Sequence, residues 1–399
     1  MATPSGTAEI NGHCDDRFAA VRREFERNFA ERDDLGAAVA ITLDGAPVVD
    51  LWAGWLDAER TRPWTRDAIV DVWSVGKAVT AIAALRLVDR GLVELDRPVA
   101  EYWPEFAQAG KATLPLRYLL SHEAGLPAVR RPLPPGANLL SWETMTAALA
   151  AQEPWWTPGR GHGYHANTFG FLAGEVLRRA TGRRLRDVVL DEIARPLGID
   201  FFIGFGPEHD ARTADWVQPP PDREAEAARL PWLQKDPATV DGVELARILA
   251  YRNPPPLPDG RGGVNTRLWR AAEYPSTNPH SNARSLARLF GALACGGSVD
   301  GVSVLSPGMV EQAREEQASG EDLVLGRPTR FGLGFQLTIP GVRPLGPHPQ
   351  SFGHYGNGAL LGYADPTERI GFSYVCNRAG RSWRDPRNIA LIDAMYAAL

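Results

Sequence analysis

A serine and a lysine three residues apart, Ser74 and Lys77, are the first residues in this sequence whose types and spacing could do chemistry. The chain has three lysines, whereas the other 40 of its 43 basic residues are arginines. Arginine keeps its proton inside a protein, but lysine loses it when its surroundings lower its pKa. Residues three apart share one face of a helix, so the hydroxyl and the amine can approach each other. The pair therefore suggests a serine nucleophile activated by a neighbouring amine.

The same pattern also fits a structural role, in which Ser74 caps a helix and Lys77 is an exposed helical residue. A chain with 14 serines and three lysines contains about 0.1 such pairs by chance, so the pattern alone is a weak motif. Other serine and metal motifs are missing from the sequence: there is no G-x-S-x-G, no H-E-x-x-H and no pair of C-x-x-C. His354 could act as the base of a catalytic triad, but nothing nominates its partners.

The elements around this pair predict how it is held. Residues 74–91 read as a helix with an apolar side, and its N-terminus would favour negative charge that develops at Ser74. Residues 36–54 read as a β-hairpin about an L-D-G turn, and residues 330–339, 351–366 and 369–378 read as strands. Helices are expected at 17–31 and 386–399. The middle of the chain is mainly helical, with long proline-rich connections.

Strand-rich ends around a helical middle predict an α/β fold (α+β) with an antiparallel sheet flanked by helices. We expect residues 1–95 and 285–399 to form this lobe and residues 96–284 to form an inserted, mainly helical lobe, with the active site between them. The net charge of −5 and the absence of a basic cluster argue against nucleic-acid binding. No apolar run is long enough for a membrane span. Three widely spaced cysteines and the lack of a secretory signal favour a cytoplasmic protein without a metal or other cofactor.

Two further stretches join Ser74 and Lys77. Tyr164 lies in a loop just before a helix that begins near Thr168, and the sequence His354-Tyr355-Gly356 falls on a late strand. Ser-x-x-Lys, a loop tyrosine and a [His/Lys]-x-Gly strand, in this order, resemble the serine β-lactamase and penicillin-binding-protein superfamily. Within it, the chain is most similar to class C β-lactamases and family VIII carboxylesterases. The resemblance covers roughly residues 20–395 and includes "LLSHEAGLP", "NARSLARLFGALACGGSVDGVSVLSP" and "FGLGFQL".

The resemblance implies a role for each motif. Ser74 would be the acylated nucleophile, Lys77 its activating neighbour, and Tyr164 the general base and later the acid. The backbone N–H groups of Ser74 and Asn357 would form the oxyanion hole. A tyrosine base at neutral pH needs a pKa about three units below its ordinary value near 10, and a neighbouring ammonium acts in that direction.

Departures from the lactamase pattern guide the substrate prediction. Ala166 stands where the lactamases have the asparagine that helps to hold the amide side chain of the substrate, and Asn167, one residue later, should point elsewhere. His354 replaces the lysine that would meet a substrate carboxylate. Both changes favour the carboxylesterase branch. The pocket residues expected from these motifs are His354, Tyr355, Gly356, Trp73 and Trp156, with Trp155 as a further candidate.

The sequence thus predicts a serine carboxylesterase that hydrolyses short-chain esters of small molecules through an acyl-enzyme on Ser74, with weak β-lactamase activity as a side reaction. An acyltransferase would use the same acyl-enzyme and pass the acyl group to an alcohol or amine. A β-lactamase or D-amino peptidase is a further alternative. A catalytically silent binding protein on the same scaffold disagrees with the intact set of Ser74, Lys77 and Tyr164.

Overall fold

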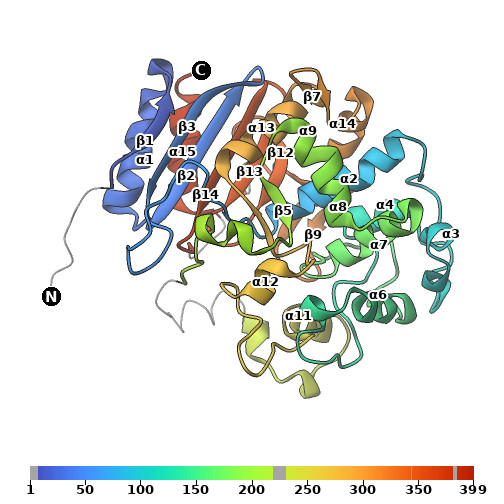
Figure 1. Cartoon of the computed structure of the whole chain (residues 1–399). Coiled ribbons are helices and arrows are strands. Elements are labelled where there is room, and N and C mark those ends of the chain that lie inside the picture. Colours follow the sequence, from blue (N-terminus) through green and yellow to red (C-terminus); the bar gives the residue numbers. More distant parts are fainter. Residues whose placement is uncertain (1–7, 219–230, 343, 381–383) are drawn as a thin grey trace.

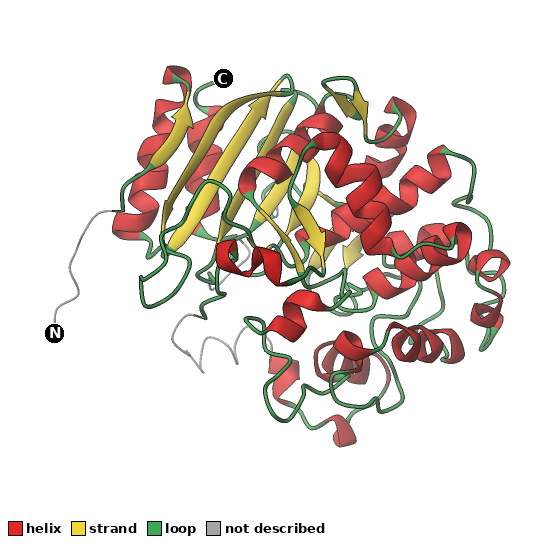
Figure 2. Ribbon diagram, viewed as in Figure 1, coloured by secondary structure: helices red, strands yellow, loops and turns green. Residues whose placement is uncertain are grey.

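The computed structural model describes residues 8–218, 231–342, 344–380 and 384–399. Its largest feature in this part of the chain is a nine-stranded antiparallel sheet with the order β1-β3-β2-β14-β13-β12-β11-β10-β9 (Figures 1 and 2). The strands are β1 Asn11–Cys14, β2 Gly36–Leu43, β3 Ala46–Gly54, β9 Ala318–Glu321, β10 Pro328–Phe331, β11 Gln336–Leu337, β12 Phe352–Tyr355, β13 Leu361–Asp365 and β14 Ile370–Cys376. Because β14 pairs with β2, the two ends of the chain meet in the middle of the sheet. The predicted α/β fold with an antiparallel sheet from both ends is confirmed.

Helices cover this sheet and extend beyond one end of it (Figure 1). They are α1 Ala19–Glu31, α2 Val75–Asp89, α3 Val99–Tyr102, α4 Leu116–Leu120, α5 Ala137–Leu140, α6 Trp142–Ala151, α7 Phe169–Thr181, α8 Leu185–Val189, α9 Arg195–Leu197, α11 Gly242–Arg252, α12 Arg267–Ala271, α13 Ala283–Ala294, α14 Pro307–Arg314 and α15 Pro386–Tyr396. Between α3 and α12 the described residues form short helices, long connections and one strand of the first small sheet described below, while the inserted helical lobe and its boundaries at 95/96 and 284/285 stay predictions. None of these helices combines the length and apolar character that a membrane span requires.

Two short sheets were not foreseen from the sequence. The first has the order β4-β6-β5, from β4 Val70–Asp71, β5 Phe201–Ile203 and β6 Pro279–Ser281. The second pairs β7 Ser298–Val299 with β8 Val302–Ser303. Strands this short carry no periodic pattern, and their pairing joins segments far apart in the sequence. The first of these sheets matters for function because β4 leads directly into helix α2.

Helix α2 differs from its sequence-based description. We expected an apolar stripe on one side, but twelve of its residues are buried, and they lie all around the helix. Its neighbours include α7, α8 and the strand β12, so it lies in the interior of the molecule. A helix buried on all sides needs apolar residues on every face. The alanines, Val79, Ile82 and the leucines of this helix meet that requirement.

Helix α13 packs closely on the sheet because β13 and β14 carry glycines where the helix crosses them. A Cβ at Gly371 would lie 2.2 Å from the carbonyl oxygen of Ala287 and 2.3 Å from the nitrogen of Gly291, both backbone atoms of α13. We expect Gly371→Ala to lower the free energy of unfolding by about 2 kcal/mol, because backbone cannot move aside as a side chain can. Gly308→Ala in α14, where a Cβ would have no neighbour within 4 Å, is the matched control. It should leave stability unchanged or raise it by about 0.5–1 kcal/mol. Chemical denaturation measures both.

Candidate active site

The N-terminus of α2 places Ser74 and Lys77 in direct contact. Lys77 Nζ lies 3.0 Å from Ser74 Oγ and donates a second hydrogen bond of 2.8 Å to the carbonyl oxygen of Ser276. Ser74 occupies the N-cap position of α2, but its hydroxyl caps no backbone N–H. The hydroxyl is instead turned toward the amine and the cavity described below. The structural alternative of a capping serine beside an exposed lysine therefore does not describe this site.

Lys77 is fully buried, with 0% of its surface exposed. Among the residues that the structure describes, no carboxylate forms an ion pair with it. Burial without a counter-charge disfavours the ammonium form and holds the pKa of Lys77 well below its usual range. A neutral amine at this position has a lone pair, and Ser74 Oγ lies within hydrogen-bond distance of it. Lys77 can thus accept the proton of the serine hydroxyl as Ser74 Oγ attacks a carbonyl carbon.

Tyr164 reaches the same place from the loop that precedes α7. Its side chain is 8% exposed, and the Nζ atom of Lys77 lies 4.9 Å from the centre of its ring. The ring also stacks on Phe331 of β10, with ring centres 6.1 Å apart and an interplanar angle of 7°. Tyr164 and Ser74 line one cavity. The structure therefore brings together the three side chains that the sequence nominates for chemistry.

The carboxylate of Asp322 holds the Tyr164 loop in place. Asp322 is 0% exposed, and its Oδ1 accepts hydrogen bonds from the backbone N–H groups of Tyr164 at 3.0 Å, Val324 at 2.9 Å and Leu325 at 2.8 Å. Its Oδ2 accepts a bond of 3.1 Å from Thr329 Oγ1. No short motif marks this residue in the sequence. Its backbone bonds tie the Tyr164 loop to the segment between β9 and β10.

Removing this carboxylate should impair turnover without touching a reacting group. We expect Asp322→Ala to lower kcat for an ester about 100-fold, because three backbone N–H groups lose their acceptor and the phenol of Tyr164 is displaced. Asp322→Asn should lose less than about tenfold, since its amide oxygen can serve the same N–H groups and its NH₂ can face the Thr329 hydroxyl. Steady-state kinetics at matched folded concentration distinguish the two. Equal, large losses in both variants would contradict this role.

Two buried histidines next to Tyr164 are neutral and structural. The ring of His122 lies 5.1 Å from that of Tyr164, and its Nδ1 accepts the backbone N–H of His165. His165 Nε2 accepts the N–H of Leu126, so its Nδ1 carries the proton that is donated to the oxygen of Gly163. Burial lowers the pKa of His122 well below its ordinary value and that of His165 to about 3. Both rings are therefore uncharged at neutral pH.

The His354-Tyr355-Gly356 strand approaches the nucleophile through its backbone. A Cβ at Gly356 would lie 2.8 Å from the carbonyl oxygen of Val72 and 3.5 Å from a methyl group of Val75. The strand end at Gly356 thus lies against the residues on either side of Trp73 and Ser74. Asn357, the next residue, lines the cavity together with Ser74. Ser74 and Asn357 therefore line one common cavity, which an oxyanion hole made of their backbone N–H groups would need.

The cavity beside Ser74 has a volume of about 480 Å³. Its lining includes Trp73, Ser74, Tyr164, Ala166, Asn167, Tyr251, Thr277, Leu325, Arg327, Gln336, Tyr355, Gly356, Asn357 and Gly358. Three of the predicted pocket residues, Trp73, Tyr355 and Gly356, are among them. The sequence did not nominate Tyr251, Arg327 or Gln336, because the segments that carry them become neighbours of Ser74 only in the fold. Gln336 falls within the "FGLGFQL" stretch, which was the one available signal.

Other predicted residues lie outside this lining. His354 is buried, with its ring 6.0 Å from that of Tyr164. Trp156 donates its indole N–H to the oxygen of Gly161. Trp155 donates to the oxygen of Ala128. Trp155 and Trp156 thus bond backbone oxygens with their indole N–H groups, and His354 is a buried residue of β12.

Asn167 follows Ala166 in the cavity lining. That its side chain points away from the substrate stays a prediction. Its amide is occupied by the protein, because Nδ2 donates 2.7 Å to the oxygen of Ala250 and Oδ1 accepts 3.2 Å from Thr277 Oγ1. Asn167 therefore helps to shape the cavity wall.

An aromatic wall stands next to the nucleophile. The ring of Trp73 lies 5.3 Å from that of Trp216 and 5.8 Å from that of Trp269. Trp216 is held through its backbone, whose N–H and carbonyl both bond the side chain of Asn265 at 2.7 and 3.0 Å. The position of Trp216, and with it the packing of Trp73, therefore depends on Asn265, which is not part of the cavity lining.

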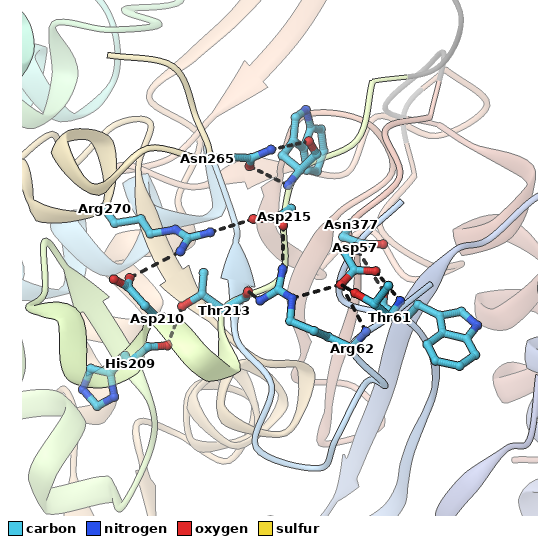
Figure 3. A network of polar contacts seen from close by, with 12 residues as sticks. Asp57, Thr61, Arg62, His209, Asp210, Thr213, Asp215, Asn265, Arg270 and Asn377 are labelled. Atoms are coloured by element: carbon cyan, nitrogen blue, oxygen red, sulfur yellow. Dashed lines mark hydrogen bonds and ion pairs between the residues drawn. The ribbon is translucent and has the colours of Figure 1, made fainter. Parts of the chain in front are cut away.

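A charged network continues behind this wall (Figure 3). Asp215, next to Trp216, accepts from Arg62 at 2.5 Å and from Arg270 at 2.8 Å. Arg62 also bonds Asp57 at 3.0 Å, and Arg270 also bonds Asp210 at 3.3 Å. Alternating charges satisfy each other there, which fixes the segment that carries Trp216. None of these five charged residues belongs to the cavity lining. Within the described residues, no group of three or more His, Cys, Asp or Glu side chains could hold a metal ion.

Comparison with known proteins agrees with this geometry. The family model described as Beta-lactamase matches residues 25–396. The chain is 36% identical to "Esterase/beta-lactamase LipL" of Mycobacterium tuberculosis, over 94% of this chain and 84% of that protein. Among solved structures, a penicillin-binding-protein homologue from Caulobacter crescentus is 38% identical with a TM-score of 0.87, covering 98% of this chain and 100% of that one.

A second solved structure, a family VIII carboxylesterase, is 35% identical with a TM-score of 0.87, over 98% of this chain and 100% of that chain. The identity and the coverage extend over both ends and the helical middle, so the likeness is not confined to one motif. The chain therefore belongs to the beta-lactamase family, shares its fold with penicillin-binding-protein homologues and family VIII carboxylesterases, and is a serine hydrolase.

Proposed function

We propose that this protein is a carboxylesterase that hydrolyses short-chain esters through an acyl-enzyme on Ser74. The observation that carries the proposal is the hydrogen bond between Ser74 Oγ and the buried, uncompensated amine of Lys77 inside a cavity that Tyr164 also lines. A hydroxyl, a proton acceptor and a phenol around one cavity are the groups that acyl transfer needs.

In the proposed reaction, Ser74 Oγ attacks the ester carbonyl while its proton passes to Lys77 and Tyr164, which act as one coupled acceptor. The negative charge on the carbonyl oxygen is bound by the N–H groups of Ser74 and Asn357. Collapse of this intermediate breaks the C–O bond, and the alcohol leaves with the proton. Water then attacks the acyl group by the same route and releases the carboxylic acid and free Ser74.

Esters are favoured over β-lactams by the residues around this centre. Ala166 supplies no amide to bind the side chain of a lactam, and the amide of Asn167 is held by Ala250 and Thr277. His354 is buried within β12 and is not part of the cavity lining, so this strand presents no fixed cation to a carboxylate, and the cation in the lining is Arg327 from another segment. We therefore expect kcat/KM for p-nitrophenyl acetate or butyrate to exceed that for a chromogenic cephalosporin. The opposite order would overturn the substrate assignment.

Replacing Tyr164 by phenylalanine tests the role of the phenol. Tyr164→Phe keeps the ring that stacks on Phe331 and removes the hydroxyl, so the fold should be unchanged. Loss of one general acid–base group should lower kcat/KM for the ester about 100-fold. Unchanged turnover in Tyr164→Phe would remove the tyrosine from the mechanism.

Product analysis with a competing alcohol measures how much of the acyl group goes to water. A dominant ester product would assign the protein as an acyltransferase instead.

A further inference from the structure

A buried carboxyl group lies three residues before the nucleophile and has no role in the mechanism above. Asp71 is 2% exposed and ends strand β4, where it pairs with His280 of β6. Its Oδ1 accepts the backbone N–H of Trp73 at 2.8 Å, and its Oδ2 accepts the indole N–H of Trp269 at 2.9 Å. In the described part of the chain, no lysine or arginine pairs with it. Burial raises the pKa of Asp71 well above its ordinary value, so this carboxyl group is retained at a cost in stability.

The residue that Asp71 binds has an unusual backbone conformation. Trp73 has a φ of +50°, in the left-handed region that residues other than glycine rarely adopt. For an aromatic residue this conformation costs about 1–2 kcal/mol. An aspartate that accepts the N–H two residues later forms an Asx turn, which stabilises such a bend. Ser74 then has φ −68° and ψ −8°, and α2 begins at Val75.

The bend at Trp73 determines where the N–H of Ser74 points. That N–H belongs to the peptide unit between residues 73 and 74, whose plane turns with the backbone torsions of Trp73. We propose that Asp71 is a positioning residue for the oxyanion hole: by binding the N–H of Trp73 it fixes the left-handed turn and aims the N–H of Ser74 at the carbonyl oxygen of the substrate. This inference rests on the proposed function, because it assigns Asp71 to the same acyl-transfer site. The bond to Trp269 serves a second purpose, since it holds that ring beside Trp73.

If Asp71 only joined β4 to its neighbours, its loss would have other measurable effects than the loss of a positioning residue. A correctly oriented N–H at Ser74 stabilises the tetrahedral oxyanion and hardly the bound ester. Loss of this orientation should therefore lower kcat, the rate of labelling by a fluorophosphonate and the affinity for a boronic acid, which forms a tetrahedral adduct with serine. The KM for the ester should change little. A general loosening of the fold would instead change the melting temperature and KM.

Three variants separate the two hydrogen bonds of Asp71. Asp71→Ala removes both acceptors. Asp71→Asn keeps an oxygen for the N–H of Trp73 but turns an NH₂ toward Trp269, and Trp269→Phe removes the same bond from the other side. Asp365→Asn is the matched control, because Asp365 is 0% exposed and also accepts the backbone N–H two residues later, that of Thr367 at 2.9 Å, at the end of β13 and outside the cavity lining.

We expect Asp71→Ala to lower kcat and the fluorophosphonate labelling rate about 100-fold, with boronic acid affinity falling in parallel and KM within about threefold of wild type. Asp71→Asn and Trp269→Phe should resemble each other and lose much less, while Asp365→Asn should keep wild-type kcat. If Asp71→Ala fails to fold, similar kcat values in Asp71→Asn and Trp269→Phe still test whether the bond to Trp73, and not the bond to Trp269, supports catalysis. Wild-type labelling rates in Asp71→Ala, or equal large losses in Asp71→Asn and Asp71→Ala without a matching loss in Trp269→Phe, would overturn the inference. Absence of ester turnover in the wild type, with intact labelling of Ser74 and a deficit in Asp71→Ala, would overturn the substrate class alone.

Discussion

Ser74→Ala is expected to lower kcat/KM for p-nitrophenyl acetate by about 10⁵-fold or more, because no other group can form the acyl-enzyme. The cavity should remain intact, since the hydroxyl caps no backbone group and its loss leaves α2 otherwise unchanged. Ester binding, measured with a slowly reacting analogue, should therefore stay within a few-fold of wild type. Loss of turnover with retained binding identifies a nucleophile and not a structural serine.

The control for this variant is a buried serine remote from the cavity. Ser373 lies in β14 and donates 3.0 Å to the oxygen of Leu361. Ser373→Ala removes one internal hydrogen bond, which costs about 1 kcal/mol of stability, and should leave kcat/KM per folded molecule unchanged. Comparable activity in Ser74→Ala and Ser373→Ala would rule out the acyl-enzyme at residue 74.

Lys77→Arg should be almost as damaging, by about 10³-fold in kcat/KM, although it keeps a positive charge. The site calls for an amine that can be neutral, and arginine cannot give up its proton. The guanidinium would also be buried against Ser276 and Tyr164, where the described residues place no carboxylate beside it. Lys77→Met, which fills similar space without an amine, should lose activity to a similar extent. Activity close to wild type in either variant would contradict proton transfer through Lys77.

The lowered pKa of Lys77 fixes the direction of two pH effects. The rate should fall as the pH drops through that pKa, because the protonated amine cannot accept the serine proton, and Lys77→Met should lack this dependence. For stability, the unfolded chain binds the lysine proton up to about pH 10.4, whereas the folded chain releases it at lower pH. The free energy of unfolding therefore rises with pH between the two pKa values. At neutral pH, Lys77→Met should be more stable than wild type while being inactive, which pH-dependent denaturation measures.

The parts of the fold that the sequence predicted are those with local signals. The hairpin at residues 36–54 forms as β2 and β3 about the turn at Asp44 and Gly45, because two apolar, β-rich runs flank a strong turn. Helix α1 begins at Ala19 and α15 ends at Tyr396, within a few residues of expectation. The continuous strand expected at 330–339 is interrupted, since Gly332 to Phe335 separate β10 from β11. Glycine with a positive φ at 334 bends the chain there.

The candidate site divides in the same way. Ser74 and Lys77 are one helical turn apart, so their contact could be foreseen from spacing, and Tyr164 was found through its motif. Asp322 and Asp71 were missed because their importance lies in hydrogen bonds to backbone atoms. A buried aspartate is indistinguishable from a surface one in a single sequence. The burial of Lys77 was equally invisible, because it depends on α7, β12 and Ser276 closing around α2.

Mass mapping of the residue that carries the acyl group decides whether Ser74 is the nucleophile. The protein is mixed with a fluorophosphonate, or quenched in acid during turnover of a slow ester, and then digested and sequenced by mass spectrometry. We expect one modified peptide, with the added mass on Ser74, and no such adduct in Ser74→Ala. An adduct on another residue, or ester turnover with no covalent intermediate at Ser74, would contradict it.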